Sequence, residues 1–309
     1  MIPIYQSWLI QIEITNACTH RCANCTRFVG HYRKPYFMSL DEISRAIDSL
    51  EGFGGGIGIM GGEPTLHPDF PAICELLRKK VSPWRCGLWT SGYRWKEYRS
   101  LIKRTFKFAV NYNDHSNPDQ KHQPVLVAID DVVQNKDLMW KLIDRCWVQE
   151  WWSPSINHKG GFFCEVAAAL DILFEGPGGY RIEKGWWNRT TDEFHDQVER
   201  YCRRCGAALP LSCSSHLEDP DLVSPSNLEL LKKVGSPKAA AGRYQIFDRV
   251  IDNEIGQCSD GWDPAIPPAW PGHANLPRRS RCDKWDPSGQ FVLSSHDASS
   301  TRTAGDGCS

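Results

Sequence analysis

The stretch Cys18-Thr-His-Arg-Cys22-Ala-Asn-Cys25 decides the fold, and it follows closely on the alternating apolar run Trp8-Leu-Ile-Gln-Ile-Glu-Ile-Thr15. The run predicts a strand, so the three cysteines lie in the loop at its carboxyl end. Three thiolates are too few for a closed tetrahedral zinc site and one fewer than an ordinary [4Fe-4S] cluster takes. A [4Fe-4S] cluster held by three cysteines leaves one iron open to an outside ligand.

A second motif, Gly61-Gly62-Glu63-Pro64, ends the short apolar strand Gly58-Ile-Met60. Between the two motifs, Ser39 and Glu42 form a capping box that predicts the start of a helix. The apolar residues of this helix recur at i, i+3, i+4 and i+7, namely Ile43, Ala46, Ile47 and Leu50. The predicted order is therefore strand, cysteine loop, helix, strand.

The two motifs together, in this order, resemble those of the radical S-adenosylmethionine (SAM) superfamily. The resemblance implies a [4Fe-4S] cluster on Cys18, Cys22 and Cys25, with SAM bound at the open iron. It also implies that SAM is cleaved reductively to a 5'-deoxyadenosyl radical, which abstracts a hydrogen atom from a substrate. Asn24 stands where the family usually has an aromatic or bulky residue.

A small zinc site is the alternative interpretation of the first three cysteines. His20 or His31 would supply its fourth ligand. This interpretation leaves the motif Gly61–Pro64 unexplained.

Further strands are predicted at Cys86–Thr90, Phe106–Val110 and Val125–Ile129. Strands that alternate with helices at this spacing predict a parallel sheet. The expected fold class is α/β, a partial (β/α)6 TIM-type barrel followed by a small cysteine-rich auxiliary domain. The active site of such a barrel lies at the carboxyl ends of the strands.

Several candidate site residues fall at those strand ends. The candidates for binding SAM are Gly61, Gly62, Glu63, Pro64, Thr90, Ser91, Asn111 and Asn113. Oxidation of a carbon radical to a carbonyl also requires a general base. The candidates for that base are Asp114, His115 and Glu165, and a hydrogen-bonded structural role is the alternative for each.

A second group of cysteines comprises Cys146, Cys164, Cys202 and Cys205. Four thiolates are enough to saturate a second [4Fe-4S] cluster. The layout is a hairpin over 155–164, a helix over 166–174 and then Cys-x2-Cys, which resembles the Twitch type of auxiliary domain, a shortened SPASM domain. A structural zinc ion on the same four residues, or plain cysteines without a metal, are the alternatives, and Cys213 could replace Cys146.

The expected domains are a radical SAM core over 1–145, the auxiliary domain over 146–213 and an extension over 214–309. Residues 222–234 of the extension predict one more helix, and 286–309 have the composition of a disordered tail. Cys258, Cys282 and Cys308 are expected to be free surface thiols.

Composition narrows the functional classes. The chain has 309 residues, 41% of them hydrophobic and 24% charged, with a net charge of -1. Bulk charge therefore gives no argument for nucleic acid or an anionic membrane as a partner, and no apolar run reaches the ~18 residues of a membrane span. The amino terminus has no features of a signal peptide. Thirteen cysteines, an odd number grouped in metal-binding patterns, favour a reducing, cytoplasmic location.

The resemblance leads to an enzyme as the first hypothesis. The expected reaction is an oxidoreductase reaction on a polar small molecule, for example at a hydroxyl of a sugar or aminocyclitol, with flavodoxin or ferredoxin as the reducing partner. A radical SAM enzyme that crosslinks or epimerises peptides is the alternative within this class. Outside enzymes, the alternative is an electron-transfer protein or a zinc-stabilised binding protein.

Overall fold

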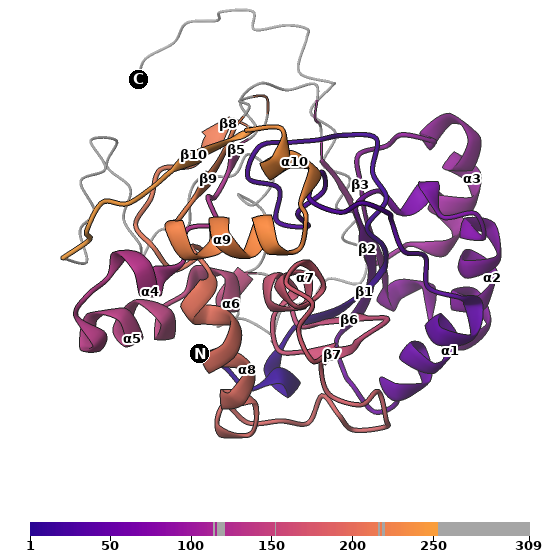
Figure 1. Ribbon diagram of the computed structural model, residues 1–309. Coiled ribbons are helices and arrows are strands. Elements are labelled where there is room, and N and C mark those ends of the chain that lie inside the picture. Colours follow the sequence, from indigo (N-terminus) through magenta and orange to yellow (C-terminus); the bar gives the residue numbers. More distant parts are fainter. Residues whose placement is uncertain (114, 116–120, 152, 216, 218–219, 253–309) are drawn as a thin grey trace, which may run out of the picture.

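A six-stranded sheet forms the centre of the computed structural model, which describes residues 1–113, 115, 121–151, 153–215, 217 and 220–252 (Figure 1). Its strand order is β4-β3-β2-β1-β6-β7. The strands are β1 (Leu9–Thr15), β2 (Gly56–Gly61), β3 (Cys86–Thr90), β4 (Ala109–Tyr112), β6 (Ser155–Asn157) and β7 (Gly160–Phe162). All neighbours pair in parallel except β6 and β7, which form an antiparallel hairpin. The predicted α/β class with a parallel core is confirmed.

Three helices cover one face of the sheet in Figure 1, α1 (Leu40–Ser49), α2 (Phe70–Lys80) and α3 (Trp95–Thr105). The predicted capping box of α1 is present, since Glu42 N donates to Ser39 Oγ and Ser39 N donates to the Glu42 carboxylate. Such a box fixes the first turn of a helix through local bonds alone.

The remaining elements surround this core. They are α4 (Ile129–Val132), α5 (Lys136–Asp144), α6 (Trp147–Trp151), α7 (Glu165–Leu173), α8 (His195–Tyr201), α9 (Pro225–Lys233) and α10 (Pro237–Ala240). Short strands pair as β5 (Lys121–His122) with β8 (Ser214–Ser215), and as β9 (Asp221–Val223) with β10 (Tyr244–Ile246). The 3-10 turns are Ile4–Gln6, Pro64–Leu66, Pro83–Arg85, Asp192–Phe194 and Cys202–Arg204.

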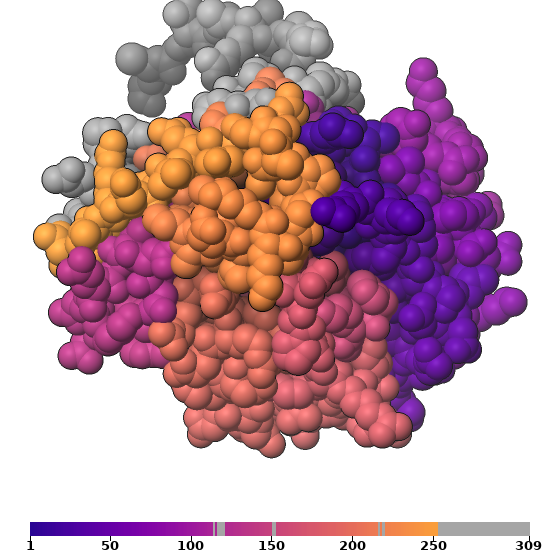
Figure 2. All heavy atoms as spheres, viewed as in Figure 1, coloured from indigo at the N-terminus to yellow at the C-terminus, as the bar shows by residue number. Residues whose placement is uncertain are grey.

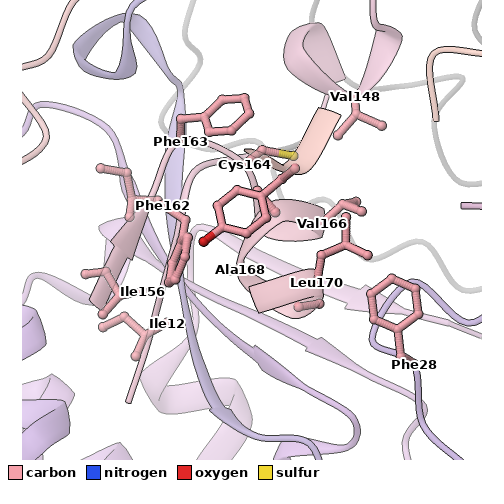
Figure 3. Close-up of a cluster of buried hydrophobic side chains, with 14 of the residues drawn as sticks. Ile12, Phe28, Val148, Ile156, Phe162, Phe163, Cys164, Val166, Ala168 and Leu170 are labelled. Atoms are coloured by element: carbon pink, nitrogen blue, oxygen red, sulfur yellow. The ribbon is translucent and has the colours of Figure 1, made fainter. Parts of the chain in front are cut away.

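The hairpin of the second cysteine segment joins the main sheet. Gln11 and Ile12 of β1 pair in parallel with Ser155 and Ile156 of β6. Figure 3 shows part of the core around this junction, with Phe162 of β7, Phe163 and Cys164 directly after it, Val166 and Leu170 of α7, and Phe28 of the cysteine loop. The division of the chain at 145 and 213 stays a prediction.

The predicted strand Val125–Ile129 is wrong. Residues 125–128 lie outside any strand, and Ile129 begins α4. The backbone of this buried apolar run bonds to loop groups instead of a neighbouring strand: Gly206 N donates to Val125 O, and Ser224 N donates to Leu126 O. A short apolar run does not by itself distinguish a strand from another buried segment.

Some predictions fall outside the described residues. These are Asp114 as a candidate base, Cys258, Cys282 and Cys308 as free thiols, and the tail 286–309. Within the described part of the chain, no helix combines the length and the apolar character that crossing a bilayer would require.

Candidate active site

The three cysteines of the first motif lie close together in the loop after β1. All are free thiols, and burial raises the pKa of Cys18 and of Cys22 to about 12. The charge of Cys25 raises both pKa values further, and Cys18 also acts on Cys22. The three thiols therefore lie within electrostatic range of one another, and three thiolates are the number that leaves one iron of a [4Fe-4S] cluster open.

The Gly61-Gly62 motif runs tightly against the start of the cysteine loop. Gly62 N donates to Thr15 O at 2.9 Å, and Glu63 N donates to Ala17 O at 2.7 Å. A Cβ atom on Gly62 would lie 2.4 Å from Ala17 O. The two motifs therefore touch through backbone atoms, which is a reason for glycine that the sequence did not suggest.

Glu63 ties the end of β2 to the end of β3. Its buried carboxylate accepts hydrogen bonds from Thr90 Oγ1 at 2.8 Å, from Ser91 N at 2.6 Å and from Ser91 Oγ at 2.6 Å. Thr65 N and Thr65 Oγ1 also donate to it. Three of the predicted SAM-binding residues, Glu63, Thr90 and Ser91, are thus bonded to one another.

The next strand brings the two predicted asparagines to the same edge. Asn111 of β4 pairs with Trp89 of β3, and Asn113 N donates to Thr90 O at 2.9 Å. Both asparagines are half-buried. The carboxyl ends of β1, β2, β3 and β4 therefore gather the first cysteines and the predicted SAM-binding residues on one side of the sheet.

Histidines flank the first cysteine group. His115 Nδ1 lies 3.4 Å from Cys22 Sγ, and the ring of His115 lies 4.6 Å from that of His20. His31, a predicted alternative zinc ligand, has both ring nitrogens engaged, by Ser236 Oγ at 2.8 Å and by Asp221 Oδ2 at 2.7 Å. Among the described residues, no three His, Cys, Asp or Glu side chains are arranged around a single metal ion.

The second group of four cysteines also lies close together. Cys146 follows α5, Cys164 precedes α7, and Cys202 and Cys205 enclose the 3-10 turn after α8. Burial raises the pKa of Cys164 to about 12, and Cys146 raises it further. Burial likewise raises the pKa of Cys202 and Cys205, with added effects of Cys146 and Cys164 on both. Cys213, the predicted replacement for Cys146, donates from Sγ to Gln123 Oε1 at 3.4 Å.

A buried charged cluster lies between the two cysteine groups. Arg27 Nη1 lies 3.3 Å from Glu13 Oε2 and donates to Glu165 O at 2.9 Å, while Arg27 Nη2 lies 3.6 Å from Glu165 Oε1. Gln11 Nε2 donates to Glu165 Oε2 at 2.7 Å. Burial alone would lower the pKa of Arg27, but Glu165 and Glu13, with smaller effects of Cys25 and Cys164, raise it.

Glu165, a predicted candidate base, is buried within this cluster. Burial raises its pKa to about 7, because Arg27 only partly offsets the loss of water and Glu13 adds a like charge. Gln11 and Glu13 were missed by the sequence analysis. The alternation in β1 gave a signal for Gln11 and Glu13, yet polar residues of a strand are more often solvated than buried. Here both side chains are buried, with exposures of 4% for Gln11 and 1% for Glu13.

Replacing Glu63 by glutamine is expected to lower the free energy of unfolding by about 1–3 kcal/mol. An amide has one acceptor oxygen, so its NH2 group would face the donors Ser91 N and Ser91 Oγ or those of Thr65 and Thr90. Urea denaturation of the metal-free protein measures the change. Glu97→Gln is the control, because that carboxylate is exposed and bonds to Arg94 and Tyr98 at the surface. Equal effects of the two substitutions would contradict the prediction.

Comparison with known proteins agrees with this site. Residues 12–127 match the family model of the radical SAM superfamily. GTP 3',8-cyclase of Mannheimia succiniciproducens is 29% identical over 117 residues, which are 37% of this chain and 35% of that enzyme. GTP 3',8-cyclase of Aeromonas hydrophila is 31% identical over 126 residues, or 38% and 36% of the two chains. This chain thus spans about a third of the length of these curated relatives.

Among solved structures, BtrN in complex with AdoMet and 2-DOIA superposes with a TM-score of 0.43 and 14% identity, over 66% of this chain and 88% of that one. The family match covers the strand, the cysteine loop and the Gly61–Pro64 motif from which the site is built. Residues 12–127 therefore form a domain of the radical SAM type.

Proposed function

We propose that the protein is a radical SAM oxidoreductase that acts on a polar small molecule, at a hydroxyl such as that of a sugar or aminocyclitol. When bound, SAM and its cluster supply a 5'-deoxyadenosyl radical that abstracts a hydrogen atom, and a second cluster supplies an electron acceptor. The observation that carries the proposal is the buried ion pair of Arg27 and Glu165, which joins the loop of the first three cysteines to the helix that follows Cys164 of the second four.

The residues of the first site have separate tasks in this proposal. Cys18, Cys22 and Cys25 would hold the SAM-binding cluster, since three thiolates leave one iron open. Glu63 holds the ends of β2 and β3 in place through Thr90 and Ser91, so that their backbone can line the SAM site. Cys146, Cys164, Cys202 and Cys205 would hold the second cluster.

Oxidation of a hydroxyl-bearing carbon requires that the hydroxyl proton leave to a base. Glu165 is our candidate, because a carboxyl group with a pKa of about 7 exchanges protons near neutral pH. Arg27 and Gln11 fix its position from two sides. His115 beside Cys22 is the second candidate, and flavodoxin or ferredoxin is the proposed reductant.

The test is iron and sulfide content with EPR after anaerobic reconstitution. The wild type is expected to bind about eight irons, and two variants about four each: Cys18/Cys22/Cys25→Ala and Cys146/Cys164/Cys202/Cys205→Ala. SAM should change the EPR signal of the wild type and of the second variant, and only the wild type should both release 5'-deoxyadenosine and oxidise substrate. Zinc with little iron, and no response to SAM, would contradict the proposal.

A further inference from the structure

The middle of the cysteine loop is held by a segment from the other end of the described chain. Asp221 Oδ1, in β9, accepts a hydrogen bond from Asn24 N at 2.5 Å, and Asn24 lies between Cys22 and Cys25. Leu222 N donates to Asn24 Oδ1 at 3.0 Å, and Asn24 Nδ2 donates to Ser214 Oγ at 2.6 Å. Both the backbone and the side chain of Asn24 are therefore bonded to the C-terminal segment.

Asp221 also pairs with two basic side chains. His31 Nε2 lies 2.7 Å from Asp221 Oδ2, and Lys238 Nζ lies 2.7 Å from Asp221 Oδ1. Lys238 Nζ donates to Cys22 O at 3.3 Å as well. Exposure is 1% for Asp221, 4% for His31 and 5% for Lys238. Buried charges of this kind are tolerated only when they are paired, so the network must stay closed for the loop to keep its place.

The conformation of the loop needs such support. Asn24 has φ of 50° and Phe28 has φ of 55°, both in the left-handed region that non-glycine residues rarely adopt. Residues in that region persist where surrounding contacts over-determine them. For Asn24 those contacts are the bonds to Asp221, Leu222 and Ser214.

The order Ser236, His31, Asp221 resembles that of a hydrolytic triad, but its chemistry is structural. Ser236 is buried, and its Oγ accepts a hydrogen bond from Ala239 N at 3.1 Å as the N-cap of α10. A nucleophile needs access to a substrate, which this hydroxyl lacks. The network therefore serves to join α10 and β9 to the cysteine loop.

We propose that residues 220–243, which we name the C-terminal clamp, set the conformation of the three-cysteine loop, with Asp221, His31 and Lys238 as positioning residues of the cluster site. In Figure 2 the orange surface of this part of the chain lies directly against the indigo N-terminal surface. Lys238 N also donates to Gly30 O at 3.2 Å, so backbone bonds extend the contact along the loop. The role of the clamp at an iron–sulfur cluster rests on the proposed function, whereas the contacts by which it holds the cysteine loop do not.

The first test uses the metal-free protein and therefore does not depend on the proposed function. Asp221→Ala is expected to raise the rate at which N-ethylmaleimide alkylates Cys22 and Cys25 by about tenfold or more, measured by peptide mass spectrometry. Asp171→Ala is the matched control, because Asp171 is an equally buried carboxylate whose partners Tyr201, Gly178 and Lys159 are not residues of the loop. Equal acceleration at both cysteines in the two variants would overturn the proposal.

The second test measures clusters. After reconstitution, Asp221→Ala is expected to lose the SAM-responsive EPR signal and about four irons while it keeps the other four. Full retention of the SAM-responsive signal would overturn the role at the cluster. If Asp221→Ala does not fold, Lys238→Met removes one partner of Asp221 and the bond to Cys22 O, and the same two readouts decide. A wild type that binds no iron would refute the proposed function. The alkylation rates would still show whether the clamp holds the cysteine loop in place.

Discussion

Replacing Arg27 by methionine is expected to lower the free energy of unfolding of the metal-free protein by about 3–5 kcal/mol. Arg27 is buried and is the cation that pairs with both Glu13 and Glu165. Without it, two buried carboxyl groups would lie near each other with no opposite charge from Arg27, and each would have to take up a proton. Urea denaturation, followed by circular dichroism under reducing conditions, measures the change.

Two further variants make this prediction specific. Arg45→Met removes an exposed partner of Asp41, and a surface ion pair of this kind contributes about 0–1 kcal/mol. In the double variant Arg27→Met/Glu165→Gln, one of the two uncompensated carboxyl groups is neutral, so the total loss should be smaller than the sum of the single losses. Strict additivity, or an Arg27→Met effect no larger than that of Arg45→Met, would show that the buried pairs contribute little.

The charged cluster also relates the two thiol groups. Arg27 lies two residues after Cys25, and Glu165 directly follows Cys164. The ion pair between them therefore connects the cysteine loop of the core to the first turn of α7. A change at Arg27 should act on both cysteine groups, whereas a change at Asp221 should act on the first alone.

The features that could be predicted from the sequence are those that depend on residues close together in the chain. The capping box of Ser39 and Glu42 and the hairpin over 155–162 depend on residues a few positions apart, and both are present. The cysteine spacing and the Gly61–Pro64 motif together indicated the superfamily. These signals are local, so a single sequence contains them in readable form.

Long-range partners could not be predicted in this way. Asn24 and Asp221 are 197 positions apart, and no periodicity relates them. Glu13 has the alternation of a strand residue whose side chain faces water, but α7 covers that face and brings Glu165 to it. The apolar run Val125–Ile129 is buried, and its backbone bonds to the C-terminal segment. A short sequence window cannot distinguish such a buried segment from a strand.

Replacing Gly62 by alanine is expected to have the second large effect. It should lower the free energy of unfolding by about 3 kcal/mol, and the reconstituted variant should lose SAM binding. The added Cβ would lie 2.4 Å from Ala17 O and 2.8 Å from both Ala17 C and Asn16 O. These are backbone atoms, so no side-chain rotation relieves the overlap. Relief would require β2 and the cysteine loop to separate, which breaks the bond from Glu63 N to Ala17 O.

Gly54→Ala is the matched control for this substitution. A Cβ on exposed Gly54 would have no neighbour within 4 Å, and neither Gly54 nor Gly62 has a positive φ, so alanine fits the backbone at both positions. Its effect should stay within about 0.5 kcal/mol. Urea midpoints of the metal-free variants and SAM titrations of the reconstituted ones compare the two. If Gly62→Ala has the same urea midpoint and the same SAM affinity as Gly54→Ala, the close backbone contact between the two motifs is needed for neither stability nor SAM binding. If it loses both, the Gly61–Pro64 motif acts first by holding the cysteine loop, and SAM binding depends on that hold.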